Sequence, residues 1–196
     1  MNDIILASTS KRREEILKRY NFQFRIIKGD IVEIINKKDS PEELVMSLAF
    51  RKAYSAAKDN PKSIVIGADT VVVYKDEILS KPKNSEDAFR MLSLLNGKTH
   101  EVITGISILN IESNEKIVDF EKTKVKFRDL DKNTIDTYIA TKEPFDKAGS
   151  YGIQDIGALL VEGIEGCYLN VVGLPLVKLD KLLNKFFDIS IINMNK

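Results

Sequence analysis

Apolar runs alternate with helical patterns along the first part of the chain, and this order constrains the fold more than any other feature. Ile4–Ala7 and Phe22–Lys28 are typical of strands. The β-branched run Ile64–Tyr74 predicts a longer strand, interrupted near its middle by a Gly-Ala-Asp triplet. His100–Leu109 and Ile117–Phe127 then predict a hairpin. Alternation followed by a hairpin indicates an α/β fold with a mixed twisted sheet and flanking helices.

Helix signals stand between these strands. Ser40–Glu43 predicts a strong helix start, with a Ser N-cap, Pro at the first position and Glu closing a capping box. Helical spacing also recurs in Ala88–Leu95, around Ile135–Ile139 and in Leu176–Leu183. The segment Asp146–Pro175 is glycine-rich, and we expect it to be irregular.

Composition narrows the function classes. The 196 residues are 43% hydrophobic, and 30 Lys and Arg residues nearly balance 29 Asp and Glu residues. This balance argues against bulk attraction to nucleic acid or an anionic membrane, so any anion site is local. The single Cys167 excludes an internal disulfide. No signal peptide or long apolar stretch is visible, so we expect a cytoplasmic protein, with residues 1–196 forming a single domain.

The stretch ASTSKRREEIL, residues 7–17, places cations at the start of a predicted helix, where the dipole disfavours them. Free N–H groups of the first turn, the Ser8 hydroxyl and the guanidinium groups of Arg12 and Arg13 could together hold a phosphate. The alternative is a surface helix whose cations point outward.

Asp69 stands inside an otherwise apolar strand, in the run IGADTVV. A buried charge is costly unless it is paired or binds a metal, so Asp69 is a candidate Mg²⁺ ligand or activator of water. The alternative is a strand end with a solvated carboxylate. Glu33 is a candidate second carboxylate, although its own segment reads equally well as a loop.

Other candidates are less specific by themselves. Lys52 and Lys81 could each reach a phosphate, but exposed lysines are common surface residues. The run DKAGSYGIQ ends in Gln154, whose amide offers one donor and one acceptor and could pair with a base edge. The alternative is a connecting loop with a polar tip. His100 is the only histidine, and without a partner cluster it reads as structural.

Taken together, these motifs resemble the Maf nucleotide pyrophosphatases, a group first named for inhibition of septum formation. The resemblance runs almost end to end and is closest to the branch associated with dTTP and UTP. It rests on ASTSKRREEIL, Glu33, LAFRKA around Lys52, IGADTVV around Asp69, Lys81-Pro82, LNGKTHEVITG, DKAGSYGIQ and NVVGLPL.

The resemblance implies hydrolysis of a nucleoside triphosphate to the monophosphate and pyrophosphate, with Mg²⁺ or Mn²⁺. A closely related alternative is the same cleavage of modified pyrimidine nucleotides. It implies an inosine-triphosphatase-like fold of two lobes around a central cleft, a homodimer, and a role in cleaning the nucleotide pool linked to cell-division arrest. By motif, Asp69 takes the place of the proton acceptor. Glu33 and Asp69 are also the candidate metal ligands, and these two roles of Asp69 compete, because a metal-bound carboxylate is a poor base and the metal could itself supply hydroxide. The residues linked to substrate choice are Arg12, Thr70 and Gln154, and those lining the cleft are Ser8, Arg13, Glu33, Lys52 and Lys81.

Three positions depart from the family pattern. Lys11 replaces the usual Pro, Asp155 replaces a glycine, and Cys167 replaces an acid. These departures bear on affinity and selectivity rather than on the reaction class. A different class of function remains as an alternative, namely a non-enzymatic regulator of septum formation that acts through a protein partner. It predicts that Asp69→Asn keeps the cellular phenotype.

Overall fold

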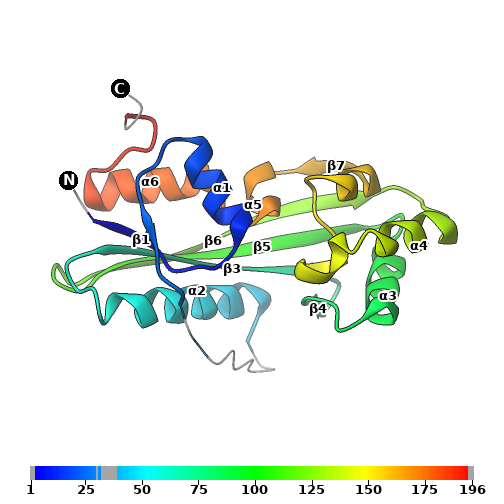
Figure 1. The fold of residues 1–196 in the computed structure, drawn as a ribbon, viewed down its shortest axis with the longest axis horizontal. Coiled ribbons are helices and arrows are strands. Elements are labelled where there is room, and N and C mark those ends of the chain that lie inside the picture. Colours follow the sequence, from blue (N-terminus) through cyan, green and yellow to red (C-terminus); the bar gives the residue numbers. More distant parts are fainter. Residues whose placement is uncertain (1–2, 30, 32–38, 194–196) are drawn as a thin grey trace. The chain divides into compact units, whose positions relative to one another are not determined.

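The computed structural model describes residues 3–29, 31 and 39–193, and these form a seven-stranded sheet flanked by helices (Figure 1). The strands are β1 (Ile4–Leu6), β2 (Arg25–Ile26), β3 (Ile64–Tyr74), β4 (Glu77–Leu79), β5 (Thr99–Asn110), β6 (Glu115–Phe127) and β7 (Val161–Glu165). Their order is β2-β1-β3-β5-β6-β7, with β4 pairing to β3. β1 is parallel to β2 and β3, whereas β4 and β7 are antiparallel to their neighbours. The predicted α/β class with a mixed sheet is confirmed.

The helices are α1 (Lys11–Arg19), α2 (Pro41–Ala57), α3 (Ser85–Leu95), α4 (Lys132–Ala140), α5 (Tyr168–Val172) and α6 (Leu176–Phe187), with 3₁₀ turns η1 (Glu143–Asp146), η2 (Ala148–Ser150) and η3 (Ile156–Leu160). The capping box predicted for α2 is present. The Glu43 amide donates to the Ser40 hydroxyl, and the Ser40 amide donates to the Glu43 carboxylate. Within the described residues, no helix combines the length and apolar character needed to cross a membrane.

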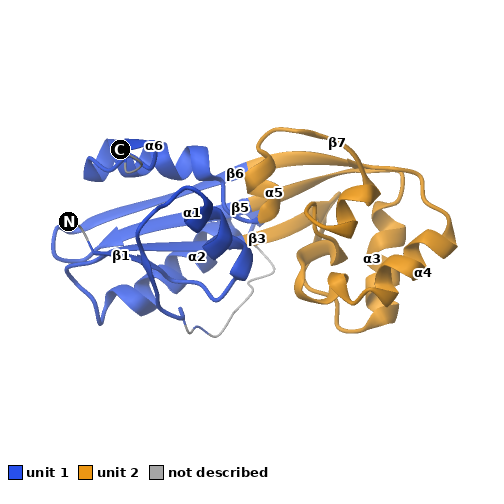
Figure 2. Ribbon diagram, turned by 45° about the horizontal axis from the view of Figure 1, so that its top comes forward, with its two compact units in different colours: residues 1–69, 104–121, 173–196 blue, residues 70–103, 122–172 orange. Residues whose placement is uncertain are grey.

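The chain divides into two compact units (Figure 2). Unit 1 comprises residues 1–69, 104–121 and 173–196, and unit 2 comprises residues 70–103 and 122–172. The strands β3, β5 and β6 contribute residues to both units.

In unit 1, α2 lies on one face of the strands, and α1 and α6 lie on the other (Figure 1). Two glycines let α2 approach closely. A Cβ on Gly67 of β3 would lie 2.3 Å from the Ala49 carbonyl oxygen, and one on Gly105 of β5 would lie 2.3 Å from that of Val45. Because no Cβ fits at either position, glycine sets the distance between helix and sheet.

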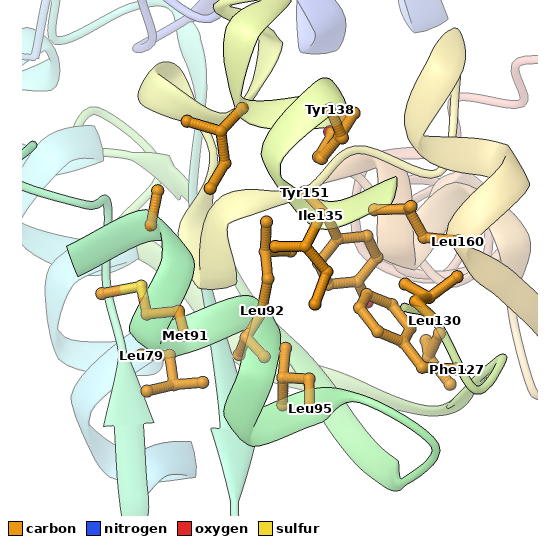
Figure 3. Packing of buried hydrophobic residues seen from close by; sticks show 14 of the residues in the cluster. Leu79, Met91, Leu92, Leu95, Phe127, Leu130, Ile135, Tyr138, Tyr151 and Leu160 are labelled. Carbon is orange, nitrogen blue, oxygen red and sulfur yellow. The ribbon is translucent and has the colours of Figure 1, made fainter. Parts of the chain in front are cut away.

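In unit 2, a hydrophobic core joins β4, α3 and α4 to the aromatic residues of β6 and the loop after η2 (Figure 3). The rings of Phe127 and Tyr151 meet edge to face, with centroids 4.7 Å apart. Leu92 and Leu95 of α3 and Leu160 of η3 are buried in the same cluster. This core anchors the segment that follows Tyr151.

Two local predictions were wrong. The strand β3 is continuous from Ile64 to Tyr74 rather than interrupted at the Gly-Ala-Asp triplet, because α2 packs against Gly67 and supplies a cation to Asp69. The segment Asp146–Pro175 is not irregular throughout, since it contains β7 and α5. Pairing with β6 makes β7 a strand, and such long-range pairing leaves little signal in local sequence.

Candidate active site

The stretch that the sequence predicts to bind phosphate begins at the carboxyl end of β1 in unit 1. The Ala7 amide donates to the Ile66 carbonyl (2.7 Å), so Ser8 lies beside the Gly-Ala-Asp triplet of β3. Ser10 occupies the N-cap position of α1, but its side chain accepts no hydrogen bond from the helix. The Ser10 hydroxyl therefore does not cap the N–H groups of the first turn. An anion site at a helix N-terminus requires such N–H groups to be available to the anion.

Arg13 donates hydrogen bonds to a backbone carbonyl and to a side-chain hydroxyl of unit 1. Its Nε donates to the Gly173 carbonyl (2.8 Å), and its Nη1 donates to the Ser8 hydroxyl (3.3 Å). The Ser8 hydroxyl also accepts from the Ser10 amide (3.2 Å). Arg12 is half-buried one residue earlier in the same turn. The structure thus brings Ser8 and Arg13 together as predicted, and it adds the Gly173 carbonyl, which sequence reasoning did not identify.

Lys52 of α2 and Asp69 of β3 form an ion pair. Both side chains are largely buried, with exposed fractions of 17% and 13%. Gly29 packs against the backbone of Lys52, since a Cβ at this glycine would lie 2.8 Å from the Lys52 carbonyl oxygen. The pair explains how a charged residue is accommodated inside an apolar strand.

The chemistry of the donors fits a metal that arrives with a phosphate ligand. Among residues 3–29, 31 and 39–193, no three His, Cys, Asp or Glu side chains gather into a metal cluster. Mg²⁺ is usually bound through one or two carboxylates together with waters and substrate phosphates, so a single Asp69 suits it. Glu33, the second predicted ligand, lies outside the described residues.

The remaining predicted residues belong to unit 2. Thr70 follows Asp69 on β3 and is half-buried, and Lys81 is exposed after β4. The Gly149 amide donates to the Ser80 carbonyl (3.1 Å), so the residue before Lys81 is tied to the DKAGSYGIQ loop.

Gln154 lies in a tightly held segment of that loop. Glu143 of η1 accepts from the Ile156 amide (3.2 Å) and the Gly157 amide (3.1 Å). The Tyr138 hydroxyl accepts from the Gly152 amide (3.3 Å) and donates to Glu143 (3.0 Å). Sequence reasoning missed Glu143 and Tyr138, because their contacts depend on how η1 and α4 pack in three dimensions.

His100 is structural, as predicted. Its ring is buried between Phe127 and Tyr151, and its Nε2 lies 2.7 Å from the Tyr151 hydroxyl. Burial lowers the pKa of His100 to about 4. The imidazole is therefore neutral at pH 7.

Comparisons with known proteins agree with the motifs. The family model described as Maf-like protein matches residues 3–186. A protein of Clostridioides difficile (strain 630) named dTTP/UTP pyrophosphatase is 51% identical over 96% of this chain and 97% of its own length. A protein of the same name from Acetivibrio thermocellus is 50% identical over 95% of this chain and 96% of its own. Among solved structures, the Ham1 protein of Staphylococcus aureus matches with a TM-score of 0.45 and 19% identity, over 64% of this chain and 72% of that one. With the family model covering nearly all of its length, the chain belongs to the Maf-like proteins.

Proposed function

We propose that this protein is a nucleoside triphosphate pyrophosphatase that cleaves dTTP and UTP to the monophosphate and pyrophosphate. The observation that carries the proposal is the set of relatives about half identical over nearly their whole length, which bear the name dTTP/UTP pyrophosphatase. The arrangement of Ser8 and Arg13 at a helix start, and of Lys52 beside Asp69, supports the same chemistry.

Phosphate binding falls to the start of α1 in this proposal. Arg13 is already oriented by the Gly173 carbonyl and Ser8, so little side-chain freedom is lost when an anion binds. Arg12 and the first-turn N–H groups add positive charge at the same helix end. Lys52 and Lys81 are the further cations that the family resemblance assigns to the triphosphate.

The proposed reaction is attack of water on the α-phosphorus. A bond forms between the water oxygen and phosphorus, the bond to the bridging oxygen of the β-phosphate breaks, and pyrophosphate leaves with the electron pair. Asp69 orients the water or accepts its proton, and Lys52 holds that carboxylate in place. A Mg²⁺ or Mn²⁺ ion held by Asp69 and Glu33 would neutralise phosphate charge and lower the pKa of bound water.

Base recognition falls to Gln154. Its amide matches the N–H and carbonyl of uracil or thymine with two hydrogen bonds. Cytosine would leave buried polar groups unpaired, at a cost of about 1–3 kcal/mol for each. Thymine and uracil differ by a methyl group, so we expect weak discrimination between dTTP and UTP.

The test is hydrolysis in ¹⁸O-labelled water with Mg²⁺ and a panel of nucleotides that includes modified pyrimidines. The proposal predicts label in the monophosphate and none in the pyrophosphate. Label in the pyrophosphate, or release of single orthophosphate, would overturn attack at the α-phosphorus. Asp69→Asn is expected to abolish turnover while leaving nucleotide binding largely intact.

Asp119→Asn is the matched control for that variant. Asp119 is also a unit 1 aspartate paired with a lysine, Lys178 (3.4 Å), and it is not among the predicted site residues. We expect it to keep wild-type turnover. Full activity in Asp69→Asn would remove Asp69 from the chemistry.

The cellular setting that we propose is the cytoplasm, with a homodimer as the assembly. Support for both comes from the family resemblance. Light scattering coupled to size-exclusion chromatography tests the dimer directly, and a monomer mass at micromolar concentration would contradict it.

A further inference from the structure

The Glu143 carboxylate in unit 2 accepts hydrogen bonds from two backbone amides and one side-chain hydroxyl. The Oε1 atom of Glu143 accepts from the Tyr138 hydroxyl (3.0 Å) and the Gly157 amide (3.1 Å), and its Oε2 atom accepts from the Ile156 amide (3.2 Å). Burial, together with the charge of Glu143, raises the pKa of Tyr138 above its usual range, so its hydroxyl keeps the proton that it donates. Both oxygens of Glu143 are therefore in use.

These contacts close a short loop of the backbone. The Tyr138 hydroxyl also accepts from the Gly152 amide (3.3 Å), so Glu143 and Tyr138 hold both ends of the segment from Gly152 to Gly157. The two ends approach closely, because a Cβ on Gly157 would lie 2.2 Å from the Gly152 carbonyl oxygen. Gln154 lies inside this closed segment, and its backbone carbonyl accepts a hydrogen bond from the Ala158 amide (3.2 Å).

The contacts of Glu143 and Tyr138 also hold a strained residue. Asp155 has φ of 46° and ψ of −141°, a backbone conformation that residues other than glycine rarely adopt. Its ψ angle sets the direction of the next peptide, whose N–H donates to Glu143. Such a conformation persists when surrounding contacts determine it, and Glu143 supplies one of them.

We propose that Glu143 is a positioning residue for Gln154, and that the Glu143–Tyr138 pair sets base selectivity by fixing the backbone on both sides of that amide. This inference rests on the proposed function. A fixed backbone at Gln154 restricts where its side-chain amide can lie. Less conformational freedom is then lost when the amide pairs with a base, and its hydrogen bonds contribute more to discrimination between bases. A mobile amide can adapt to the donor and acceptor pattern of cytosine as well.

The experiment compares kcat/KM for UTP and CTP in wild type, Glu143→Ala, Gln154→Ala and the double variant. Glu143→Ala is expected to lower the UTP-over-CTP ratio about tenfold, as loss of a well-made hydrogen bond does. We expect Glu143→Ala to act by raising KM for UTP, with kcat at saturating UTP close to the wild-type value. The double variant is expected to match the single variants, because the two residues act through one contact.

Glu143→Gln and Tyr138→Phe are milder substitutions that keep the test possible if Glu143→Ala does not fold. Glu143→Gln keeps one accepting oxygen, and Tyr138→Phe leaves the carboxylate in place, so both are expected to give intermediate ratios. The control for general destabilisation is Asp131→Ala. It removes the N-cap of α4, where Asp131 accepts from the Thr134 amide (2.7 Å), at the opposite end of that helix from Tyr138.

The outcomes separate this inference from the proposed function. Loss of selectivity in Gln154→Ala but not in Glu143→Ala overturns the inference and leaves the function intact. Additive losses in the double variant, or an equal loss in Asp131→Ala, overturn it too. Absence of pyrophosphate release by the wild type from every pyrimidine triphosphate is a separate result, which defeats the proposed function and this inference with it.

Discussion

Lys52 and Asp69 form an ion pair that joins α2 to the middle of β3, with both side chains largely shielded from water. Removing one partner leaves the other charge poorly solvated. We therefore expect Lys52→Met to lower the free energy of unfolding by about 2 kcal/mol. The measurement is urea unfolding of Lys52→Met, Asp69→Asn and the double variant. Coupling predicts that the double variant loses less than the sum of the two, and additive losses would show that the pair contributes nothing.

Binding of a nucleotide at the start of α1 is expected to raise the melting temperature. A ligand that binds the native state at 100 times its Kd adds about 2.7 kcal/mol of stability. The measurement is thermal unfolding with Mg²⁺ and a UTP analogue whose α-β bridge resists hydrolysis. Arg13→Met should abolish most of the shift, because Arg13 is oriented toward this helix end by Ser8.

Arg19→Met is the matched control, since Arg19 lies in the last turn of the same helix. It should retain the wild-type shift. A melting temperature that saturating nucleotide does not move in the wild type would count against the phosphate site at α1.

These two sites show how much the sequence could predict. The capping box of α2 and the contact between Ser8 and Arg13 at the start of α1 depend on neighbouring residues, so local patterns were sufficient to predict them. The partner of Asp69 lies 17 residues away on another element, and the Gly173 carbonyl lies 160 residues from Arg13. The residue types indicated candidate site residues, but contacts over that sequence separation come from tertiary packing and could not be predicted.

Gly67→Ala is expected to destabilise the protein severely. Its Cβ would lie 2.3 Å from a carbonyl oxygen of α2, so helix and strand must separate, which costs about 3 kcal/mol or more. The matched control is Gly163→Ala in β7, where an added Cβ meets no atom within 4 Å. Chemical denaturation of both variants is the measurement. Equal stabilities would show that close packing of α2 does not depend on Gly67.

The buried His100 predicts a specific pH dependence of stability. Burial lowers its pKa from 6.5 to about 4 in the folded state. Between these values the unfolded chain binds a proton that the folded chain does not, so stability is full above pH 6.5 and falls as the pH drops toward 4. The shift corresponds to about 3 kcal/mol.

Comparison with His100→Gln isolates this contribution from that of the carboxylates. The glutamine amide can still bond to the Tyr151 hydroxyl, but it does not titrate. Denaturation between pH 4 and 7 should give a shallower slope for the variant than for wild type. Parallel slopes would mean that His100 titrates normally in the folded protein.

Asp155→Gly is expected to stabilise the protein. The backbone of Asp155 lies in a region that suits glycine, the residue that the family resemblance places here, and the strain costs about 1–3 kcal/mol. Glycine adds freedom to the unfolded chain, worth about 0.4–1 kcal/mol in the opposite direction. The net gain in unfolding free energy is therefore about 1 kcal/mol.

The matched control is Asp188→Gly. Asp188 has φ of 54° and ψ of 34°, the ordinary left-handed conformation, which Asp adopts more readily than most residues. Asp188→Gly therefore relieves less strain than Asp155→Gly. The added freedom of glycine in the unfolded chain should cancel that small gain in stability. Urea unfolding of the two variants gives the comparison. If Asp155→Gly gains no more than Asp188→Gly, the unusual ψ of Asp155 carries no strain, and the Glu143 contact to the Ile156 amide is not holding an unfavourable backbone.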